Sequence, residues 1–431
     1  MRGLLLRSAW VGVIAACVDT SAGLGPAPKI VGLAVAPNPY STLSFVVTFK
    51  GDAVDSARVL YQEPGRAVET TPFYRAQGDS LRIVALGLRQ STRYVSSVEA
   101  RGQHGTANSD TLSFVTDSLP SLLRGVHLNQ TGSASLGYIL LALSLPPDTT
   151  SFAVAFDESG EVRWYRQFPA GVSAGEVKQQ VNDNFTIFLG ETRGWDPTYG
   201  RYVEFRPDGE IADTFAASAP FYTDNHELLT TGSGGSVDAS HLFGYELRVV
   251  DLTFKGGPSN ALVAGHTLLR QSANGQVQFL WNAWDHFVPE DWIEPTGVNP
   301  PLDFDHPNSL DFDRDGNYVV SFRAMGEVTK IDSRTGAIIW RLGGRNNQFT
   351  ILNDPLGGFS AQHTARVLPN GDLLLYDNGL RHAPPETRAV EYRLDQNART
   401  AALVWEYRHT PPLFTPFAGS VQRYAVGHVR H

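Results

Sequence analysis

A short unit that recurs along the chain limits the possible folds more than any other feature. It consists of a strand, a polar turn that usually contains glycine, and a second strand that often ends in tryptophan. It occurs at residues 157–164, 206–211, 274–281, 332–340 and 395–405. A second unit, at 181–189, 314–322 and 369–376, lies between its copies. One copy of each unit supplies four strands, which is the content of one β-propeller blade.

The repeats therefore predict an all-β protein in which residues 122–431 form a β-propeller. We expect five recognisable blades and a partial sixth, so that the propeller is six-bladed with an incomplete last blade. The composition agrees, because 41 Gly and 26 Pro beside 23 Phe, 15 Tyr and 8 Trp favour short strands joined by tight turns.

A separate β-sandwich is predicted for residues 29–117. Six stretches between residues 30 and 115 alternate apolar and polar residues at strand period. Residues 86–98, with Tyr94, resemble the tyrosine corner of a fibronectin type III domain, an immunoglobulin-like sandwich. The segment contains no group of acid, base and nucleophile, so we interpret it as a spacer or docking module.

The first 28 residues have the pattern of an export signal. Arg2 and Arg7 precede the apolar run 8–16, which is too short to span a bilayer and ends at Cys17. The run resembles the bacterial lipoprotein signal, in which the cysteine is lipidated. Residues 1–17 are thus predicted to be a signal peptide with a lipobox at Cys17, and 18–28 a linker. Ordinary cleavage, for example after Ala22, is the alternative. Either route predicts a periplasmic or cell-surface protein, and lipidation would anchor it to a bacterial membrane.

Charge and cysteine content exclude several kinds of partner. The chain has 35 Lys and Arg against 44 Asp and Glu, a formal net charge of −9, which argues against a nucleic-acid partner. Cys17 is the one cysteine, so an intrachain disulfide or a thiolate metal cluster cannot form.

Three histidines are candidates for chemistry. His226, His306 and His363 each begin an expected inner strand and precede a glycine-containing turn by eight to ten residues. Inner strands of successive blades line one central channel. We therefore expect these sequence-distant histidines to become neighbours.

Several ordered motifs resemble the bacterial arylsulfate sulfotransferase family. They lie at 305–309, 316–323, 336–344, 362–366 and 377–379, within a similarity that covers about residues 120–425. The resemblance implies a propeller that moves a sulfuryl group from an aryl sulfate to a phenol through a sulfated histidine, without a cofactor. It suggests His363 as the nucleophile, with His306, Asn308 and Arg323 around the sulfuryl group and His226 as a further match.

The resemblance also bears on the last blade. Members of the family continue with a further strand where this sequence reads 419–428. Closure of the propeller would then require a strand from elsewhere, such as 136–145.

The chemistry of these residue types suits the implied roles. A neutral imidazole is a nucleophile near pH 7, and Arg323 and Asn308 offer a cation and an amide donor for sulfuryl oxygens. His306 or His226 could protonate the departing phenolate and later deprotonate the acceptor, and no metal is needed. Two alternatives stay open: a non-catalytic propeller that binds a ligand or serves adhesion, and a hydrolase with water as acceptor.

Weaker candidates have simpler explanations. Arg381 is a substrate-binding candidate or part of a solvated loop, and Trp195 and Trp292 could stack on an aromatic substrate. Residues 311–317 match half of a calcium loop, but Phe322 occupies the position of its last ligand, which favours a tight turn. The remaining histidines considered are expected at the surface or in loops: His241, His266, His382, His409, His428 and His431.

Overall fold

The computed structural model describes residues 25–129, 137–191, 200–293 and 301–423. The ordered elements in these residues are β-strands and four short 3-10 helices, so the prediction of an all-β protein is confirmed. Cys17 and the rest of the predicted signal peptide lie outside the described residues, as do Trp195, His428 and His431. Among the described helices, none has the length and hydropathy needed to cross a bilayer.

The chain divides into two compact units. The first comprises residues 1–38 and 44–118, and the second comprises 39–43 and 119–431. The first unit is a β-sandwich of two antiparallel sheets. One sheet has the order β1 (Lys29–Pro37), β2 (Phe45–Asp52), β6 (Ser80–Ala85). The other contains β3 (Ser56–Gln62), β4 (Glu69–Thr70), β5 (Tyr74–Arg75), β7 (Arg93–Gly102), β8 (Gly105–Asn108) and β9 (Leu112–Val115).

The sandwich core follows from the alternation seen in the sequence. Along β3, buried residues alternate with half-buried ones, and Val59 packs with Phe45 and Ile83 of the other sheet. The Tyr94 hydroxyl accepts a hydrogen bond from the backbone N–H of Arg89 at 2.9 Å, which is the backbone contact expected of a tyrosine corner.

The second unit contains five sheets in its described residues. Their strands are β10 (Ile139–Leu145), β11 (Thr150–Phe156), β12 (Val162–Gln167); β13 (Val172–Gln179), β14 (Phe185–Glu191), β15 (Arg201–Phe205), β16 (Ile211–Phe215); β17 (Tyr222–Thr231), β18 (Ala239–Val250), β19 (Ala261–Ser272), β20 (Val277–Asn282), β21 (Leu302–Asp303); β22 (Pro307–Phe312), β23 (Tyr318–Phe322), β24 (Glu327–Ile331), β25 (Ile338–Gly343); and β27 (His363–Val367), β28 (Leu373–Asp377), β29 (Arg388–Asp395), β30 (Thr400–Arg408), β26 (Thr350–Leu352).

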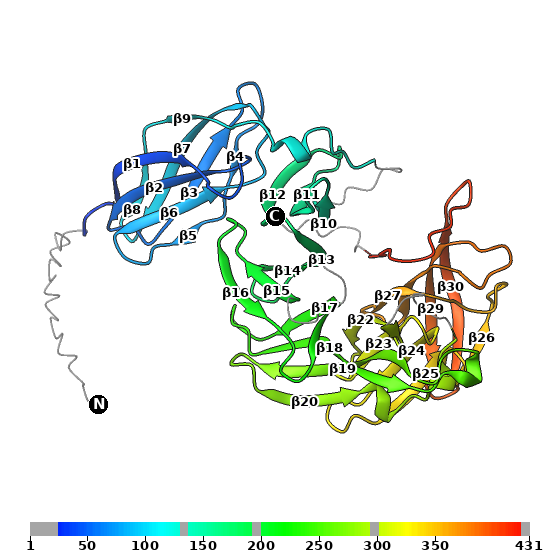
Figure 1. The fold of residues 1–431 in the computed structure, drawn as a ribbon. Helices are drawn as coiled ribbons and strands as arrows, with labels where there is room; N and C mark the ends of the chain where they lie inside the picture. Colours follow the sequence, from blue (N-terminus) through cyan, green and yellow to red (C-terminus); the bar gives the residue numbers. More distant parts are fainter. Residues whose placement is uncertain (1–24, 130–136, 192–199, 294–300, 424–431) are drawn as a thin grey trace, which may run out of the picture. The chain divides into compact units, whose positions relative to one another are not determined.

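These sheets are arranged as propeller blades. Within each, consecutive strands pair antiparallel, except that β21 and β26 add in parallel to β19 and β30. The first antiparallel strand of one sheet contacts that of the next: β10 with β13, β13 with β17, β17 with β22, and β22 with β27 (Figure 1). First strands that meet in this way are the inner strands of successive blades. The predicted β-propeller is therefore present in the second unit.

The three-stranded sheet differs in place from the one expected. The blade β27–β30 at the end of the chain has four antiparallel strands, whereas β10–β12 at the start of the unit has three. The incomplete blade is thus the first and not the last, and residues 139–145 form β10 of that blade. The described residues between 119 and 423 form no sixth sheet.

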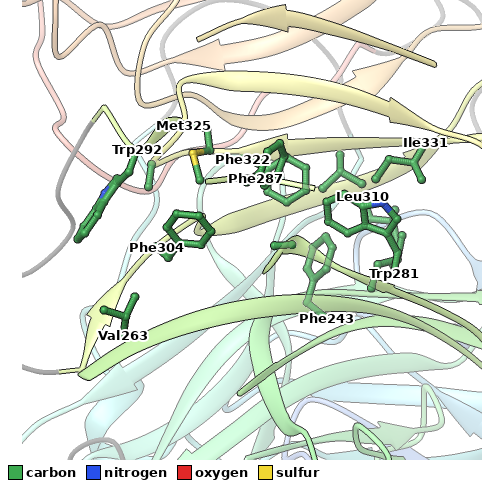
Figure 2. Packing of buried hydrophobic residues seen from close by; sticks show 14 of the residues in the cluster. Phe243, Val263, Trp281, Phe287, Trp292, Phe304, Leu310, Phe322, Met325 and Ile331 are labelled. Atoms are coloured by element: carbon green, nitrogen blue, oxygen red, sulfur yellow. The ribbon is translucent and has the colours of Figure 1, made fainter. Parts of the chain in front are cut away.

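Apolar side chains fill the space between neighbouring blades. The largest cluster joins the sheet of β17–β20 to that of β22–β25, with Phe243, Trp281, Leu310 and Phe322 in close packing (Figure 2). Trp292 belongs to this cluster and is 3% exposed. Its proposed stacking on substrate is therefore wrong, because its ring is part of the core.

The acidic stretch 311–317 forms the expected tight turn. The backbone N–H of Asp313 donates to the Asn317 carbonyl oxygen at 2.8 Å, and Gly316 N–H donates to that of Asp313 at 2.8 Å. The Lys330 ammonium group contacts both Asp313 and Asp315. The turn thus pairs its carboxylates with a protein cation.

Candidate active site

The inner strands β13, β17, β22 and β27 all carry an irregularity. Their register shifts lie between Ala174 and Val177, Thr223 and Leu228, Pro307 and Ser309, and His363 and Arg366. A bulge bends a strand and re-aims the side chains next to it. His226, Asn308 and His363 lie within or at the edge of these irregularities, which is how side chains from separate strands can converge.

The backbone is left-handed at His306 and at residues on both sides of the pair Gln362 and His363. His306 has a φ of 51°, and Ala361 and Thr364, on either side of Gln362 and His363, have a φ of 52°. For residues other than glycine, such conformations cost about 1–3 kcal/mol each and gather at functional sites. Neighbouring strands hold them: Arg323 N–H donates to the His306 carbonyl oxygen at 2.9 Å.

The three predicted histidines come together. The ring centroids of His226 and His306 are 4.6 Å apart, and those of His306 and His363 are 6.5 Å apart. Both pairs meet edge to face. The expectation that residues from β17, β27 and the start of β22 become neighbours is therefore confirmed.

His363 is held in one tautomer by its surroundings. Its Nδ1 lies 3.1 Å from the Ala361 carbonyl oxygen and 2.7 Å from Oδ1 of Asn378. A carbonyl oxygen can only accept, and the Asn378 amide nitrogen donates to the carbonyl oxygens of Thr415 and Ala418, so Nδ1 carries the proton. Nε2 therefore holds the lone pair, and the backbone N–H of Ala418 donates to it at 3.3 Å.

The environment of His363 also sets its charge. Burial lowers the pKa of His363 to about 3, and the nearby His306, His226 and Arg323 act in the same direction, whereas the hydrogen bond that Nδ1 donates to Asn378 Oδ1 acts against them. The imidazole is therefore neutral near pH 7. A neutral imidazole with an unprotonated Nε2 is the nucleophilic form.

Arg323 and Asn308 support the same region. The Arg323 side chain is buried, and its Nη2 donates to the Pro416 carbonyl oxygen at 2.9 Å. Asn308 Nδ2 donates at 2.7 Å to the carbonyl oxygen of Gln362, the residue before His363. Arg323 thus supplies a fixed cation near the rings, and Asn308 fixes the backbone that carries His363.

Two aspartates engage the other histidines through Nδ1. Asp224 Oδ1 lies 2.9 Å from His226 Nδ1, and Asp303 Oδ2 lies 2.5 Å from His306 Nδ1. Burial opposes protonation of His226, but Asp224 overcomes it and raises the pKa of His226. For His306 burial prevails over Asp303, so the pKa of His306 is lowered. The two imidazoles thus differ in charge preference although both face a carboxylate.

His266 on β19 lies behind both aspartates and was wrongly expected at the surface. It is 3% exposed, with Nδ1 2.8 Å from Asp305 Oδ1 and 3.8 Å from Asp303 Oδ1, and Nε2 3.5 Å from Asp224 Oδ2. Burial works against its charge, but the surrounding carboxylates raise the pKa of His266 well above its ordinary value. The strand pairing explains the error, because β21 pairs in parallel with β19 and brings Asp303 and Asp305 to His266.

A metal ion is one further use of this cluster to consider. Single ligand atoms of His266, Asp303 and Asp305 lie within 4.8 Å of one another. However, both ring nitrogens of His266 already face carboxylates, and its backbone N–H also donates to Asp305 at 3.1 Å. These contacts form an ion-paired network, and we assign no metal to it.

Charged residues also connect the inner strands along the chain beyond the histidines. Lys178 contacts Glu176 and Glu227, and Arg366 Nη2 lies 2.7 Å from Glu227 Oε2. The Glu227 side chain is fully buried, and Arg366 Nη1 also donates to the Leu310 carbonyl oxygen at 2.7 Å. This charged cluster of Glu176, Lys178, Glu227 and Arg366 connects β13, β17 and β27.

One other histidine was also misplaced by the sequence. His241 is 3% exposed and lies between Thr231 and the Tyr318 hydroxyl, with 3.0 Å to each. His382 and His409 lie in loops, as expected, and contact the carbonyl oxygens of Glu386 and Pro411 in their own loops. The His382 side chain is nevertheless buried, 3.4 Å from Asp377.

Arg381 is not brought to the histidines by any contact in the described residues. Its backbone N–H donates to Ser360 Oγ at 3.0 Å, and its side chain is exposed at a cavity of about 450 Å³ that Gly343, Gly344 and Phe359 also line. The solvated-loop interpretation fits this position better than the substrate-binding one.

Residues 415–419 were missed entirely. This segment offers the Pro416 carbonyl to Arg323, the Thr415 carbonyl to Asn378 and the Ala418 N–H to His363 Nε2. The sequence around it, Phe414 to Gly419, has no charged or imidazole group that would have drawn attention. The acidic partners could have been predicted more easily, since Asp303 and Asp305 come shortly before His306 in the sequence.

Comparison with known families identifies most of the chain. The sequence model of the family described as Arylsulfotransferase (ASST) matches residues 105–430. No curated protein matches the sequence.

Solved structures show weaker likenesses. A protein of unknown function from Bacteroides caccae has 13% identity and a TM-score of 0.36, covering 81% of this chain and 93% of its own. A virginiamycin B lyase from Staphylococcus aureus has 11% identity and a TM-score of 0.31, covering 75% and 82%. Neither likeness supports an argument about function.

Proposed function

The chain belongs to the arylsulfotransferase family, and we propose that it moves a sulfuryl group from an aryl sulfate to a phenol through a sulfated His363. The family match supports sulfotransferase activity in general. The observation that carries the finer proposal is the state of His363, which has Nδ1 protonated and hydrogen-bonded, Nε2 unprotonated, and a pKa lowered to about 3 by burial.

In the first half-reaction the Nε2 lone pair of His363 attacks the sulfur of the donor. The N–S bond forms as the S–O bond to the aryl group breaks, and the electron pair leaves with the aryl oxygen. Arg323 offsets the negative charge on the sulfuryl oxygens. A neighbouring imidazolium protonates the departing oxygen.

In the second half-reaction a phenol takes the place of the first product. The same imidazole, now neutral, accepts the phenol proton while the phenol oxygen attacks sulfur. The N–S bond breaks and its electron pair returns to Nε2 of His363. Splitting one transfer into two displacements is the usual advantage of a covalent intermediate.

His226 is our choice for the proton carrier. Asp224 raises the pKa of His226 against the effect of burial, whereas burial lowers the pKa of His306. The raised pKa makes the charged form of His226 available near neutral pH. His306, 4.6 Å from His226 and 6.5 Å from His363 between ring centroids, would then act as a neutral hydrogen-bonding group.

The test is transfer from 4-nitrophenyl sulfate to added phenol, with His363→Asn as the matched variant. Asparagine keeps a donor for the Ala361 and Asn378 oxygens but has no nucleophilic nitrogen. We expect phenol-dependent nitrophenol release, loss of that release in the variant, and a gain of the mass of SO₃ on the peptide that contains His363 when donor is added alone. Release independent of phenol would indicate water as acceptor, and no release would favour the ligand-binding propeller.

The proposals for the rest of the chain rest on sequence and topology. We propose that the first unit is fibronectin type III-like, supported by its two sheets and the Tyr94 contact. We also propose export and lipid anchoring at Cys17, supported by the basic start and the apolar run before the cysteine.

A further inference from the structure

A buried group lies next to His226 and His306, and Asp224 is its one member with a part in the reaction as written above. It consists of Asp224, His266, Asp303 and Asp305, each less than one-tenth exposed. His266 is the member that contacts all three carboxylates. Asp224 and Asp303 in turn contact His226 and His306 through Nδ1. His266, which lies outside the proposed substrate site, is therefore linked through these aspartates to both His226 and His306.

We propose that His266 is a positioning residue: as one buried imidazolium between three carboxylates, it fixes His226 and His306 in the tautomer that presents Nε2 to the substrate. The inference rests on the proposed sulfuryl transfer and adds its proton-holding network. It concerns residues that do not touch the reacting atoms.

The charge of the two aspartates fixes the tautomer of the histidines beside them. An ionised carboxylate can only accept hydrogen bonds, so Asp224 and Asp303 require a proton on Nδ1 of His226 and His306. Asp224 Oδ1 also accepts the backbone N–H of His226 at 2.9 Å. A protonated aspartate could instead donate to Nδ1 and place the imidazole proton on Nε2. The tautomer thus depends on keeping both aspartates charged.

Keeping these aspartates ionised costs free energy. Three carboxylates in one buried site repel each other and lose hydration, so an isolated set would take up protons. Burial does oppose ionisation of Asp224 and Asp303, yet the pKa of both is lowered, because the imidazoles beside them prevail. His266 is the one imidazole shared by all three, since its two ring nitrogens face opposite partners.

The fold also fixes His266 itself. It pairs with Tyr245 across β18 and β19, and the Phe304 N–H donates to the Ala264 carbonyl oxygen at 3.0 Å beside the β19–β21 pairing. Within the described residues, the Asp305 carboxylate hydrogen-bonds to His266 and not to His226 or His306. Changing Asp305 therefore perturbs His266 without removing a direct partner of either histidine.

The experiment follows imidazole nitrogens by NMR in protein labelled with ¹⁵N-histidine, without substrate. In the wild type we expect His266 to be protonated on both nitrogens at pH 7 and neutral His306 to carry its proton on Nδ1. His226 should carry its proton on Nδ1 once the pH is high enough for its imidazole to be neutral. Asp305→Asn and His266→Gln should both shift His226 and His306 toward the Nε2–H tautomer. The matched control His241→Gln removes another 3% exposed histidine of the same hairpin and should leave those signals unchanged.

Kinetics give the second readout. Asp305→Asn should lower kcat for nitrophenyl sulfate roughly 10- to 100-fold with little change in KM, which is the usual range for an outer partner that orients a ligating or reacting imidazole. An unprotonated nitrogen on His266 in the wild type, unchanged tautomers in Asp305→Asn, or one bound metal ion per chain would each overturn the proposal. Expected NMR signals in a protein without transfer activity would refute the proposed function alone.

Discussion

The neutral state of His363 makes a quantitative prediction about stability and pH. The pKa of His363 is lowered to about 3 in the folded protein by burial, whereas an unfolded chain has an ordinary value of about 6.5. Below pH 6.5 His363 therefore binds a proton in the unfolded state but not in the folded state, so the free energy of unfolding decreases until the pH approaches 3. At about 1.36 kcal/mol per pH unit, the loss from this one group reaches roughly 2.7 kcal/mol at pH 4.5.

His363→Asn removes this term. We expect the free energy of unfolding of the variant, relative to the wild type, to improve by about 2.7 kcal/mol between pH 7.5 and pH 4.5. Urea unfolding followed by tryptophan fluorescence measures this in the propeller, because seven of the 8 tryptophans lie between residues 164 and 405. Trp10, the eighth, lies in the predicted signal peptide.

His226→Asn is the control of opposite sign. The pKa of His226 is raised, so its contribution to stability is present below pH 6.5 and is lost as pH rises through the folded value. On acidification the wild type should therefore gain over this variant. A difference between His363→Asn and wild type that stays constant from pH 7.5 to 4.5 would refute the reasoning, since His363 would then titrate alike in both states.

Two further predictions concern other parts of the chain. Arg366→Met leaves Lys178 as the remaining cation beside the buried Glu227. It should lower the free energy of unfolding by about 3 kcal/mol in the same urea assay. A loss below about 1 kcal/mol would show that the charged cluster does not stabilise the propeller. Cys17→Ser should release the protein from the membrane fraction of a bacterial host, and continued membrane retention of the variant would argue against lipid anchoring there.

The sequence predicted the individual strands and turns better than the grouping of the strands into blades. Strand period and glycine turns reveal each hairpin, because both are local properties. The place of the three-stranded blade is not local. It depends on which segment pairs beside β10, and residues 139–145 read alike as an inner or an outer strand.

The candidate site divides in the same way. His226, His306 and His363 could be predicted to converge because each was expected at the entry of an inner strand. The structure places His363 at the start of β27, His306 just before β22 and His226 within β17. His266 could not, because it lies in the middle of β19 and is brought to Asp303 and Asp305 by a parallel pairing with the two-residue strand β21. The segment 415–419 contributes backbone groups, which any sequence supplies, so nothing in its residue types indicated the contact with His363.

The separation of charge within the site links its structure to the proposed chemistry. A displacement that needs both a nucleophile and an acid near pH 7 requires two imidazoles of unlike protonation. Amide and carbonyl oxygens around His363 stabilise no charge strongly enough to offset its burial, so its pKa falls to about 3. Asp224 supplies a full negative charge next to His226, so the pKa of His226 rises although burial opposes its protonation as well. Pairs of titratable groups whose environments push their pKa values apart mark the acid and the nucleophile. In the proposed transfer, the difference between Asn378 and Asp224 as partners therefore assigns the attack to His363 and the proton to His226.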